Sequence, residues 1–125
     1  MAGGFPGDAG GMPQPPYNRA ANVQGNQQAQ LTGTAKDDVM RLNVGAGKNE
    51  ATVTGGAGND QVDIIWEKYR DHGLKVVRPG QEGFDGVPEG KARDTSVVRV
   101  GKDVEQVMIY AREADGSLTL VPTPW

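Results

Sequence analysis

The sequence predicts a mainly β protein, in which a short parallel β-roll or glycine-rich β-meander precedes a C-terminal antiparallel hairpin sheet. Three observations lead to this prediction. Short runs of β-branched residues are bounded by glycine, glycine and aspartate recur between residues 32 and 63, and an Asp-Gly turn separates the last two apolar runs. One short helix and a disordered N-terminal tail complete the expected architecture.

The composition limits what can hold this chain together. Its 125 residues are enough for one ordinary domain, but they include 19 Gly and 8 Pro against 2 Trp, 3 Tyr and 2 Phe. Glycine loses the most conformational entropy on folding and buries no side chain. The sequence therefore calls either for disorder in part of its length or for a source of stability besides an apolar core, such as a metal ion.

Several classes of protein are excluded or disfavoured by composition. The absence of cysteine excludes disulfides and thiolate zinc sites. A net charge of -3, with no basic run longer than two residues, lacks the electrostatic signature of nucleic-acid binding. No apolar run approaches the length of a membrane-spanning helix, so no transmembrane segment is expected.

Residues 1–30 are rich in glycine, proline and glutamine, and their few apolar residues follow no period. This segment is expected to be a disordered tail, because it cannot bury enough apolar area to offset the cost of ordering. It contains neither the basic region nor the apolar region of a secretory signal. A secreted or cell-surface location would therefore require a route that does not use an N-terminal signal peptide.

Residues 31–125 are expected to form a single β-rich domain, with glycine repeats over residues 31–65. The stretch 66–78 predicts a helix from Trp66 to Gly73, where Gly73 occupies a C-terminal capping position, followed by a strand from Leu74 to Arg78. A hairpin through residues 70–73 is the competing interpretation. Residues 79–93 contain four Gly and two Pro and are expected to be a loop, with Phe84 either packed on the core or exposed.

The C-terminal part, residues 94–125, gives the plainest strand pattern. Runs at 95–100, 104–112 and 118–122 are rich in valine, leucine and isoleucine, and the turn at 114–117 contains Asp-Gly. Val107, Ile109 and Ala111 alternate with more polar residues, as in a strand with one buried face. A β-hairpin is therefore expected here.

Three nine-residue segments can be aligned between the tail and the predicted helix: 32–40, 44–52 and 55–63. The third, Gly-Gly-Ala-Gly-Asn-Asp-Gln-Val-Asp, matches Gly-Gly-x-Gly-x-Asp-x-apolar-x at every fixed position. In this pattern the chain resembles the repeats-in-toxin (RTX) family of secreted bacterial proteins, whose nonapeptides wind a parallel β-roll around calcium. Calcium takes six to eight oxygen ligands, and glycine lets the backbone curl tightly enough for its carbonyl groups to supply some of them.

The resemblance implies a set of calcium ligands. In that family each ion lies between units i and i+2, which would place Asp37 and Asp60 on one side of the roll and Asn49 on the other. The carbonyl groups that would complete the site, and the residues that would point inward, follow from the same alignment: Gly33, Ala35, Gly56 and Gly58 for the carbonyls, and Val39, Ala51 and Val62 for the interior.

The spacing departs from that of the family. Asp37 and Asn49 are twelve residues apart, and Asn49 and Asp60 are eleven apart, where nine is expected. The additional residues either lengthen the strands or interrupt the roll. A β-meander with glycine turns and no metal therefore remains an alternative.

The function expected from this resemblance is that of a calcium-binding, non-enzymatic secreted bacterial protein in which the ion orders the repeats. The alternative is a secreted effector or surface-assembly protein that acts by protein–protein contact or self-association without metal. Catalysis is poorly supported. His72 is the single histidine, with Ser96 and Ser117 as the two serines, and a histidine near a helix end is usually a capping group.

Overall fold

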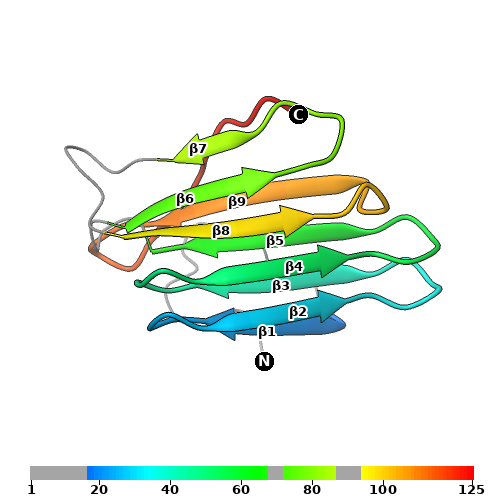
Figure 1. Cartoon of the computed structure of the whole chain (residues 1–125), viewed down its shortest axis with the longest axis horizontal. Coiled ribbons are helices and arrows are strands. Elements are labelled where there is room, and N and C mark those ends of the chain that lie inside the picture. The colour runs from blue at the N-terminus through cyan, green and yellow to red at the C-terminus, as the bar shows by residue number, and fades with distance from the viewer. Residues whose placement is uncertain (1–16, 68–71, 87–93) are drawn as a thin grey trace.

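The structure is a computed structural model that describes residues 17–67, 72–86 and 94–125. Every regular element in these ranges is a strand (Figure 1). The ten strands are β1 (Arg19–Val23), β2 (Gln28–Thr32), β3 (Val39–Val44), β4 (Glu50–Thr54), β5 (Gln61–Trp66), β6 (His72–Val77), β7 (Phe84–Gly86), β8 (Asp94–Val100), β9 (Gln106–Arg112) and β10 (Leu118–Leu120). The prediction of a mainly β protein is confirmed.

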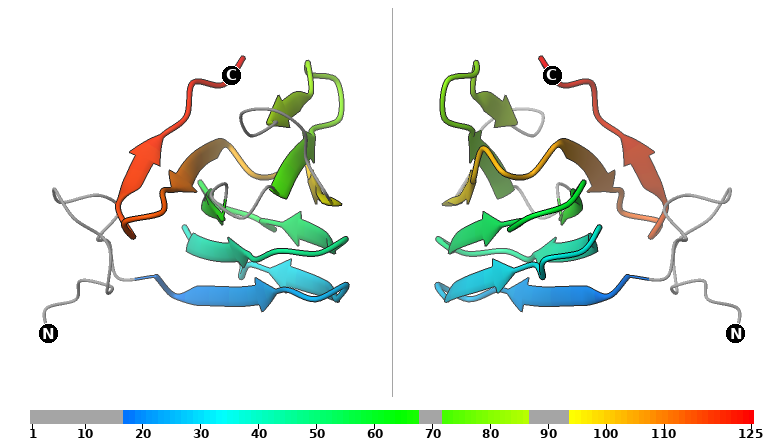
Figure 2. Two further views of the ribbon diagram at one scale, coloured as in Figure 1. Left: turned by 90° about the vertical axis from the view of Figure 1, so that its left-hand side faces the viewer. Right: turned by 90° about the vertical axis from the view of Figure 1, so that its right-hand side faces the viewer.

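The strands form two mixed sheets of five strands that face each other as two layers (Figure 2). Sheet A has the order β1-β3-β5-β9-β10, and sheet B has the order β2-β4-β8-β6-β7. The first four strands of each order run parallel, and the fifth strand is antiparallel to its neighbour.

The chain alternates between the sheets, and each passage through both of them is called a coil here. β1 and β2 form the first coil, β3 and β4 the second, and β5 and β8 the third. Gln28 pairs with Glu50 and Val39 pairs with Gln61, each 22 positions apart, whereas Arg19 of β1 pairs with Met40 of β3, 21 positions apart. In each pair these registers keep the side-chain alternation in phase, as for the buried Val23 and Val44, because a slip of one residue would turn every side chain of a strand to the opposite face.

The core lies between the two sheets, where inward-facing side chains of successive coils stack. Met40 packs in register with Val62, and Leu42 with Ile64, and all four are fully buried. Ala51 and Val62 are interior residues, as predicted from the repeats, but Val39 is only partly buried. Met40 occupies the inward position that Val39 was expected to fill.

An insertion interrupts the regular coils between β5 and β8. β6 and β7 join sheet B beyond the position of β8, so that β8 later lies between β4 and β6. The insertion explains why β5 and β9 pair across 45 residues, with Gln61 opposite Gln106.

An aromatic cluster closes the end of the core next to β6 and β7. Phe84 lies 6.3 Å from Trp66 and 6.5 Å from Trp125, measured between ring centroids. The Trp66 indole N–H donates to the His72 carbonyl at 2.7 Å, and the guanidinium of Arg78 lies 5.1 Å from the centre of the Trp125 ring. Phe84 therefore packs on the core, which was one of its two predicted positions.

Two predictions about the first two-thirds of the chain are wrong. The prediction of a disordered tail over residues 1–30 is wrong for β1 and for the first residues of β2, and residues 1–16 lie outside the described residues. The helix expected from Trp66 to Gly73 is not formed at either end of that range, where strands stand instead: Trp66 is the last residue of β5 and His72 the first residue of β6. Residues 68–71 lie outside the described residues.

The C-terminal strands are confirmed, but their arrangement differs from a single hairpin sheet. β8 belongs to sheet B and β9 to sheet A, so the turn between them continues the coil. Only β9 and β10 form the antiparallel pair that was expected. The predicted loop 79–93 contains the short strand β7, and its residues 87–93 lie outside the described ranges.

Candidate functional site

Turns at the two opposite edges of the stacked coils carry most of the polar side chains that the sequence singled out. The acidic edge comprises turns 33–38, 55–60 and 101–105, which lead from sheet B to sheet A. The amide edge comprises turns 24–27 and 45–49, which lead from sheet A to sheet B, together with Ser96 at the start of β8. Figure 1 shows the two sets of turns at opposite ends of the strands.

At the acidic edge, each coil supplies a carboxylate to the coil before it. The backbone N–H of Asp38 donates to Oδ1 of Asp60 at 2.8 Å, and the backbone N–H of Asp60 donates to Oε1 of Glu105 at 2.6 Å. Side-chain oxygens thus satisfy main-chain donors that the turns would otherwise leave buried and unpaired.

The Asp38 carboxylate is fully engaged. It accepts hydrogen bonds from the backbone N–H of Thr34 at 2.7 Å, from the Thr34 hydroxyl at 2.9 Å and from the Asn18 amide. Burial opposes its ionisation, but the bonds from Asn18 and Thr34 outweigh it and lower the pKa of Asp38.

The Asp60 carboxylate is only half engaged. Gly56 stands 22 residues after Thr34, but its backbone N–H donates to Asp103 at 2.8 Å, as does the N–H of Gly55 at 3.0 Å. Oδ2 of Asp60 is consequently buried without a hydrogen-bond partner, in a residue that is 1% exposed. Burial raises the pKa of Asp60, and the negative charges of Asp38 and Glu105 raise it further.

The predicted calcium ligands are partly brought together. The turns containing Gly33 and Ala35, and Gly56 and Gly58, stack directly, since a Cβ on Gly56 would lie 2.6 Å from the Thr34 carbonyl oxygen. Asp37, however, is exposed, and its Oδ1 accepts the Asn59 N–H at 2.7 Å.

The residue that faces Asp60 is Asp38, because it lies one coil of 22 residues earlier, so the sequence alignment of the first unit was wrong by one position. Among the residues that the structure describes, no three His, Cys, Asp or Glu side chains are grouped closely enough to hold a metal ion.

The corrected alignment reveals a regular period of eleven residues. Polar residues occur at the exposed Gln27 and at the buried Asp38, Asn49 and Asp60, and positive-φ glycines occur at Gly25, Gly47 and Gly58 with Lys36 in the remaining position. Each coil is therefore two units of eleven, and each unit is about two residues longer than the nonapeptide of the RTX family. The additional residues lengthen the strands.

At the amide edge, Asn49 uses both ends of its amide group. Its Oδ1 accepts the Gln27 N–H at 2.8 Å, and its Nδ2 donates to the Gly45 carbonyl at 2.9 Å and to the Ser96 hydroxyl oxygen at 3.1 Å. Asn49 is 1% exposed. It lies on the side opposite Asp60, as the sequence predicted, but it joins coils through hydrogen bonds.

His72 lies in contact with Ser96 at this edge, with 2.7 Å between Nε2 and the hydroxyl oxygen. Both residues are fully buried, and Oγ of Ser96 donates to the Gly47 carbonyl at 3.0 Å. Burial lowers the pKa of His72, and Nδ1 has no hydrogen-bond partner. The prediction that His72 is a surface capping group is wrong; its ring is part of the buried packing of this edge.

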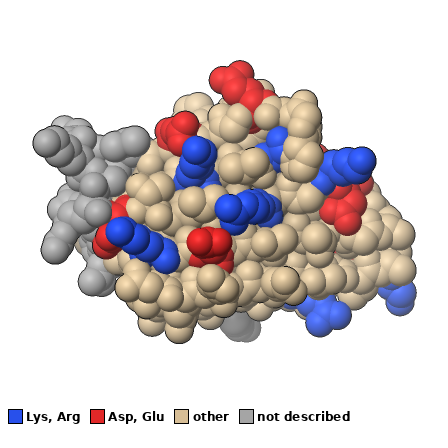
Figure 3. Space-filling model, in the orientation of Figure 1, with Lys and Arg blue, Asp and Glu red and all other residues tan. Residues whose placement is uncertain are grey.

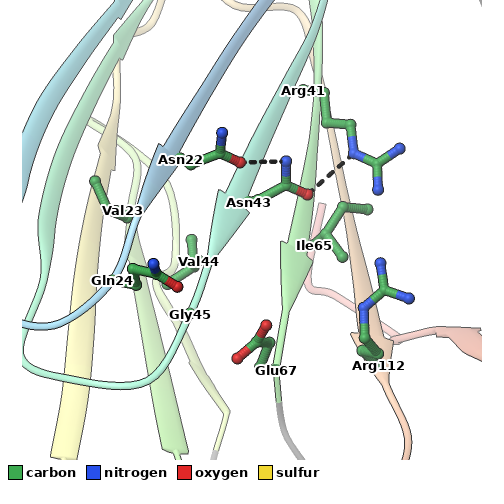
Figure 4. A pocket seen from close by; sticks show the side chains of 10 residues that line it. All are labelled: Asn22, Val23, Gln24, Arg41, Asn43, Val44, Gly45, Ile65, Glu67 and Arg112. Carbon is green, nitrogen blue, oxygen red and sulfur yellow. Dashed lines mark hydrogen bonds between the residues drawn. The ribbon is translucent and has the colours of Figure 1, made fainter. Parts of the chain in front are cut away.

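A hollow of about 420 Å³ lies on the outer face of sheet A, over β1, β3 and β5 (Figure 4). A row of hydrogen bonds forms its floor: Asn43 donates to Asn22 at 2.6 Å, and Nε of Arg41 donates to Asn43 at 3.0 Å. Arg112 and Glu67 lie at its rim. This hollow was not predicted from the sequence, although asparagine recurs 21 residues apart at positions 22 and 43.

Neighbouring side chains hold Arg41 in place on this face. Its guanidinium lies 5.7 Å from the centre of the Tyr17 ring, and the Tyr17 hydroxyl donates to Asp63 at 2.8 Å. Gln61 donates to the other oxygen of Asp63 at 2.8 Å. Burial raises the pKa of Asp63, while these two hydrogen bonds and the charge of Arg41 lower it in part.

The outer face of sheet B is different in character. Figure 3 shows acidic and basic side chains interspersed over it. Arg99 and Glu50 form an ion pair at 3.4 Å, with both side chains more than half exposed, so the pair contributes little to stability. This face presents a mixed, solvated surface.

Comparison of the chain with protein-family models, with curated proteins and with solved structures found no match. The resemblance to RTX repeats therefore rests on residues 32–63 alone. In the described residues, no helix has the length and apolar character needed to span a membrane.

Proposed function

We propose that this chain is a non-enzymatic binding protein that acts by contact, through the hollow on the outer face of sheet A. The observation that carries the proposal is the floor of that hollow. The Asn22, Asn43 and Arg41 side chains are fixed to one another by hydrogen bonds across two strands, which presents them with little conformational freedom left to lose on binding.

The charge of the hollow favours an acidic partner. Two arginines, Arg41 and Arg112, and one glutamate, Glu67, line it. Arginine is suited to carboxylate recognition because its planar group donates two parallel hydrogen bonds. The amide groups add donors and acceptors for a peptide backbone, so the partner of this site is an acidic peptide segment.

Titration with an acidic, a neutral and a basic peptide of equal length, followed by NMR chemical shifts, tests this proposal. The acidic peptide is expected to shift resonances of β1, β3 and β5, and Arg112→Ala to weaken binding at least about tenfold. Arg99→Ala, on the outer face of sheet B, is the matched control and is expected to change nothing. Equal responses to the three peptides would reject the acidic partner.

The edges of the coils support a fold that stands without an ion. At both edges, side-chain oxygens of one coil accept backbone N–H groups of the neighbouring coil, as Asp60 and Asn49 do. The buried environment of Ser96 and His72 likewise favours a structural role over a nucleophile and base, since a substrate would have to displace their existing partners.

Calcium binding is the second candidate function, and Oδ2 of Asp60 is the observation that favours it. The position that a Cβ on Gly55 would occupy is 2.5 Å from this oxygen and 2.5 Å from the Asp103 carbonyl oxygen, so the two oxygens converge on Gly55. Carboxylate and carbonyl oxygens are the ligands calcium prefers. Asp60 and the Asp103 carbonyl group would hold the ion, which would neutralise charge at this edge.

Circular dichroism in chelator, in calcium and in magnesium separates the two candidates. The binding protein is expected to have the same β spectrum in all three conditions. A spectrum that forms in calcium only, and that Asp60→Asn abolishes, would support the calcium protein and overturn an ion-free fold. A secreted or surface location remains a prediction, which detection of the chain inside cells only would contradict.

A further inference from the structure

The two ends of the stacked coils differ in how their edge strands are protected. At the end next to the aromatic cluster, the outermost strands β7 and β10 have three residues each and run antiparallel to their neighbours. At the other end, β1 and β2 have five residues each, and among the described strands each has a single neighbour. Very short edge strands resist further pairing, whereas longer regular ones invite it.

The β1/β2 end also lacks the usual protection against association. Natural edge strands carry lysine, proline or bulges that discourage pairing with another chain. Between Asn18 and Thr32, Arg19 is the single charged residue, and there is no proline. Ala20, Gln28 and Gln30 are exposed along these strands. The edges of β1 and β2 are therefore suited to pairing with strands of another chain.

The polar side chains of this end are self-complementary. Seven of the thirteen residues from 18 to 30 are asparagine or glutamine. An amide side chain is both donor and acceptor, so an amide surface can pair with a copy of itself, as in the amide ladders of stacked strands. Asn43 and Asn22 already form one rung of such a ladder at 2.6 Å, and Asn22 lies on the outermost strand.

We infer that two copies of this chain associate through the free edges of β1 and β2. A two-fold axis across this end makes each pair of contacting strands antiparallel and joins the five-stranded sheets of the two copies into continuous ten-stranded ones. The association uses main-chain groups and the amide side chains of residues 18–30. It goes beyond the proposed peptide binding and does not depend on it.

Sedimentation of the full chain over a range of micromolar concentrations tests the inference. The expected result is a reversible dimer. Gln30→Lys places a charge on β2 near its symmetry copy and is expected to weaken the dimer at least about tenfold. Thr52→Lys is the matched control, because Thr52 pairs with Gln30 in the register but lies on the interior strand β4. It is expected to leave the dimer intact.

Hydrogen exchange at low and high protein concentration shows whether a second copy of the chain, and not some other segment, protects the edges of β1 and β2. Protection of the β1 and β2 amides is expected to rise with concentration and to fall in Gln30→Lys. A monomer at every concentration, or protection that does not depend on concentration, would overturn the inference. Circular dichroism confirms that each variant is folded, so that loss of the dimer is not misread as unfolding.

Discussion

The acidic edge and the amide edge carry polar residues at equivalent positions, eleven apart, but close the coils with different chemistry. Asn49 is neutral, and both its oxygen and its nitrogen have partners. Asp60 fills the equivalent place eleven residues later with a carboxylate, and one of its oxygens has none. A neutral amide can satisfy donors and acceptors together, whereas a carboxylate offers acceptors alone.

Both edges join neighbouring coils by hydrogen bonds from backbone N–H groups to side-chain oxygens, but the acidic edge does so with charged groups and the amide edge with a neutral one. The amide edge holds neighbouring coils together at every pH at which its groups stay neutral. The acidic edge carries the like charges of Asp38, Asp60 and Glu105 close together, which costs free energy unless a proton or a cation offsets it. Four predictions, from the largest expected effect to the smallest, sharpen this contrast.

Asn49→Ala is expected to be the most damaging change, with a loss of about 3 kcal/mol or more in the free energy of unfolding. The substitution leaves the Gln27 N–H and the Gly45 carbonyl without their partner in a buried place. Urea unfolding measures the loss. Lys48→Ala, at the exposed neighbouring position, is the control; an equal effect of the two changes would refute the role given to the amide edge.

Gly58→Ala is expected to cost at least about 2 kcal/mol, and Gly25→Ala about 1 kcal/mol. Both glycines have positive φ, at 89° and 64°. A Cβ on Gly58 would lie 2.7 Å from the Lys36 backbone, whereas on Gly25 it meets nothing within 4 Å. Thermal unfolding of the two variants compares a coil-to-coil contact with backbone strain alone. The reverse order of the two losses would mean that the turns are not stacked as described.

Asp60→Asn is expected to stabilise the ion-free protein by about 1 kcal/mol at neutral pH. The folded protein holds the Asp60 proton more tightly than the unfolded chain, because its pKa is raised above 3.8. The wild-type contribution is therefore fully present below pH 3.8 and is lost as the pH rises through the folded pKa. Asparagine does not ionise, so its advantage should disappear in acid. Unfolding in chelator at several pH values tests this, and destabilisation at neutral pH would contradict it.

Titration of His72 is expected to have the smallest effect on the free energy of unfolding, below about 1 kcal/mol. Its pH dependence is expected to be opposite in sign to that of Asp60. Its pKa in the folded protein is lowered from 6.5 by burial, so the unfolded chain binds the proton more readily. Stability should fall as the pH drops below 6.5. His72→Gln, which keeps a polar group near Ser96, should flatten the dependence in this range. An unchanged slope would assign it to other groups.

The sequence predicted the strands with strong alternation and missed those that depend on their neighbours. β9 was found because Val107, Ile109 and Ala111 alternate with polar residues. β1 and β2 are rich in alanine, asparagine and glutamine, which have little intrinsic preference for strands. They are strands because β3 and β4 lie alongside in register, which is tertiary information.

The sequence placed Asp60 and Asn49 on opposite edges correctly, but its alignment of the first repeat was wrong by one position, for a reason that the residues explain. Asp37 and Asp38 are adjacent, and a nine-residue template selects the first of them. Requiring equal spacing between units selects Asp38 instead, since Asp38, Asn49 and Asp60 are each eleven residues apart. The hollow on sheet A could not be predicted, because the pairing of strands distant in sequence brings Arg112 to the same hollow as Arg41 and Glu67.

The late arrival of β8 between β4 and β6 restricts the order in which this chain can fold. β6 is made 22 residues before β8, yet among the described strands its neighbours are β7 and β8. If sheet B forms strand by strand from β2, it cannot extend beyond β4 until β8, which follows β6 and β7 in the sequence, pairs with β4. The hairpin of β6 and β7 can join sheet B only when β8 inserts between β4 and β6. That insertion forms contacts between residues far apart in the sequence, and such contacts slow folding.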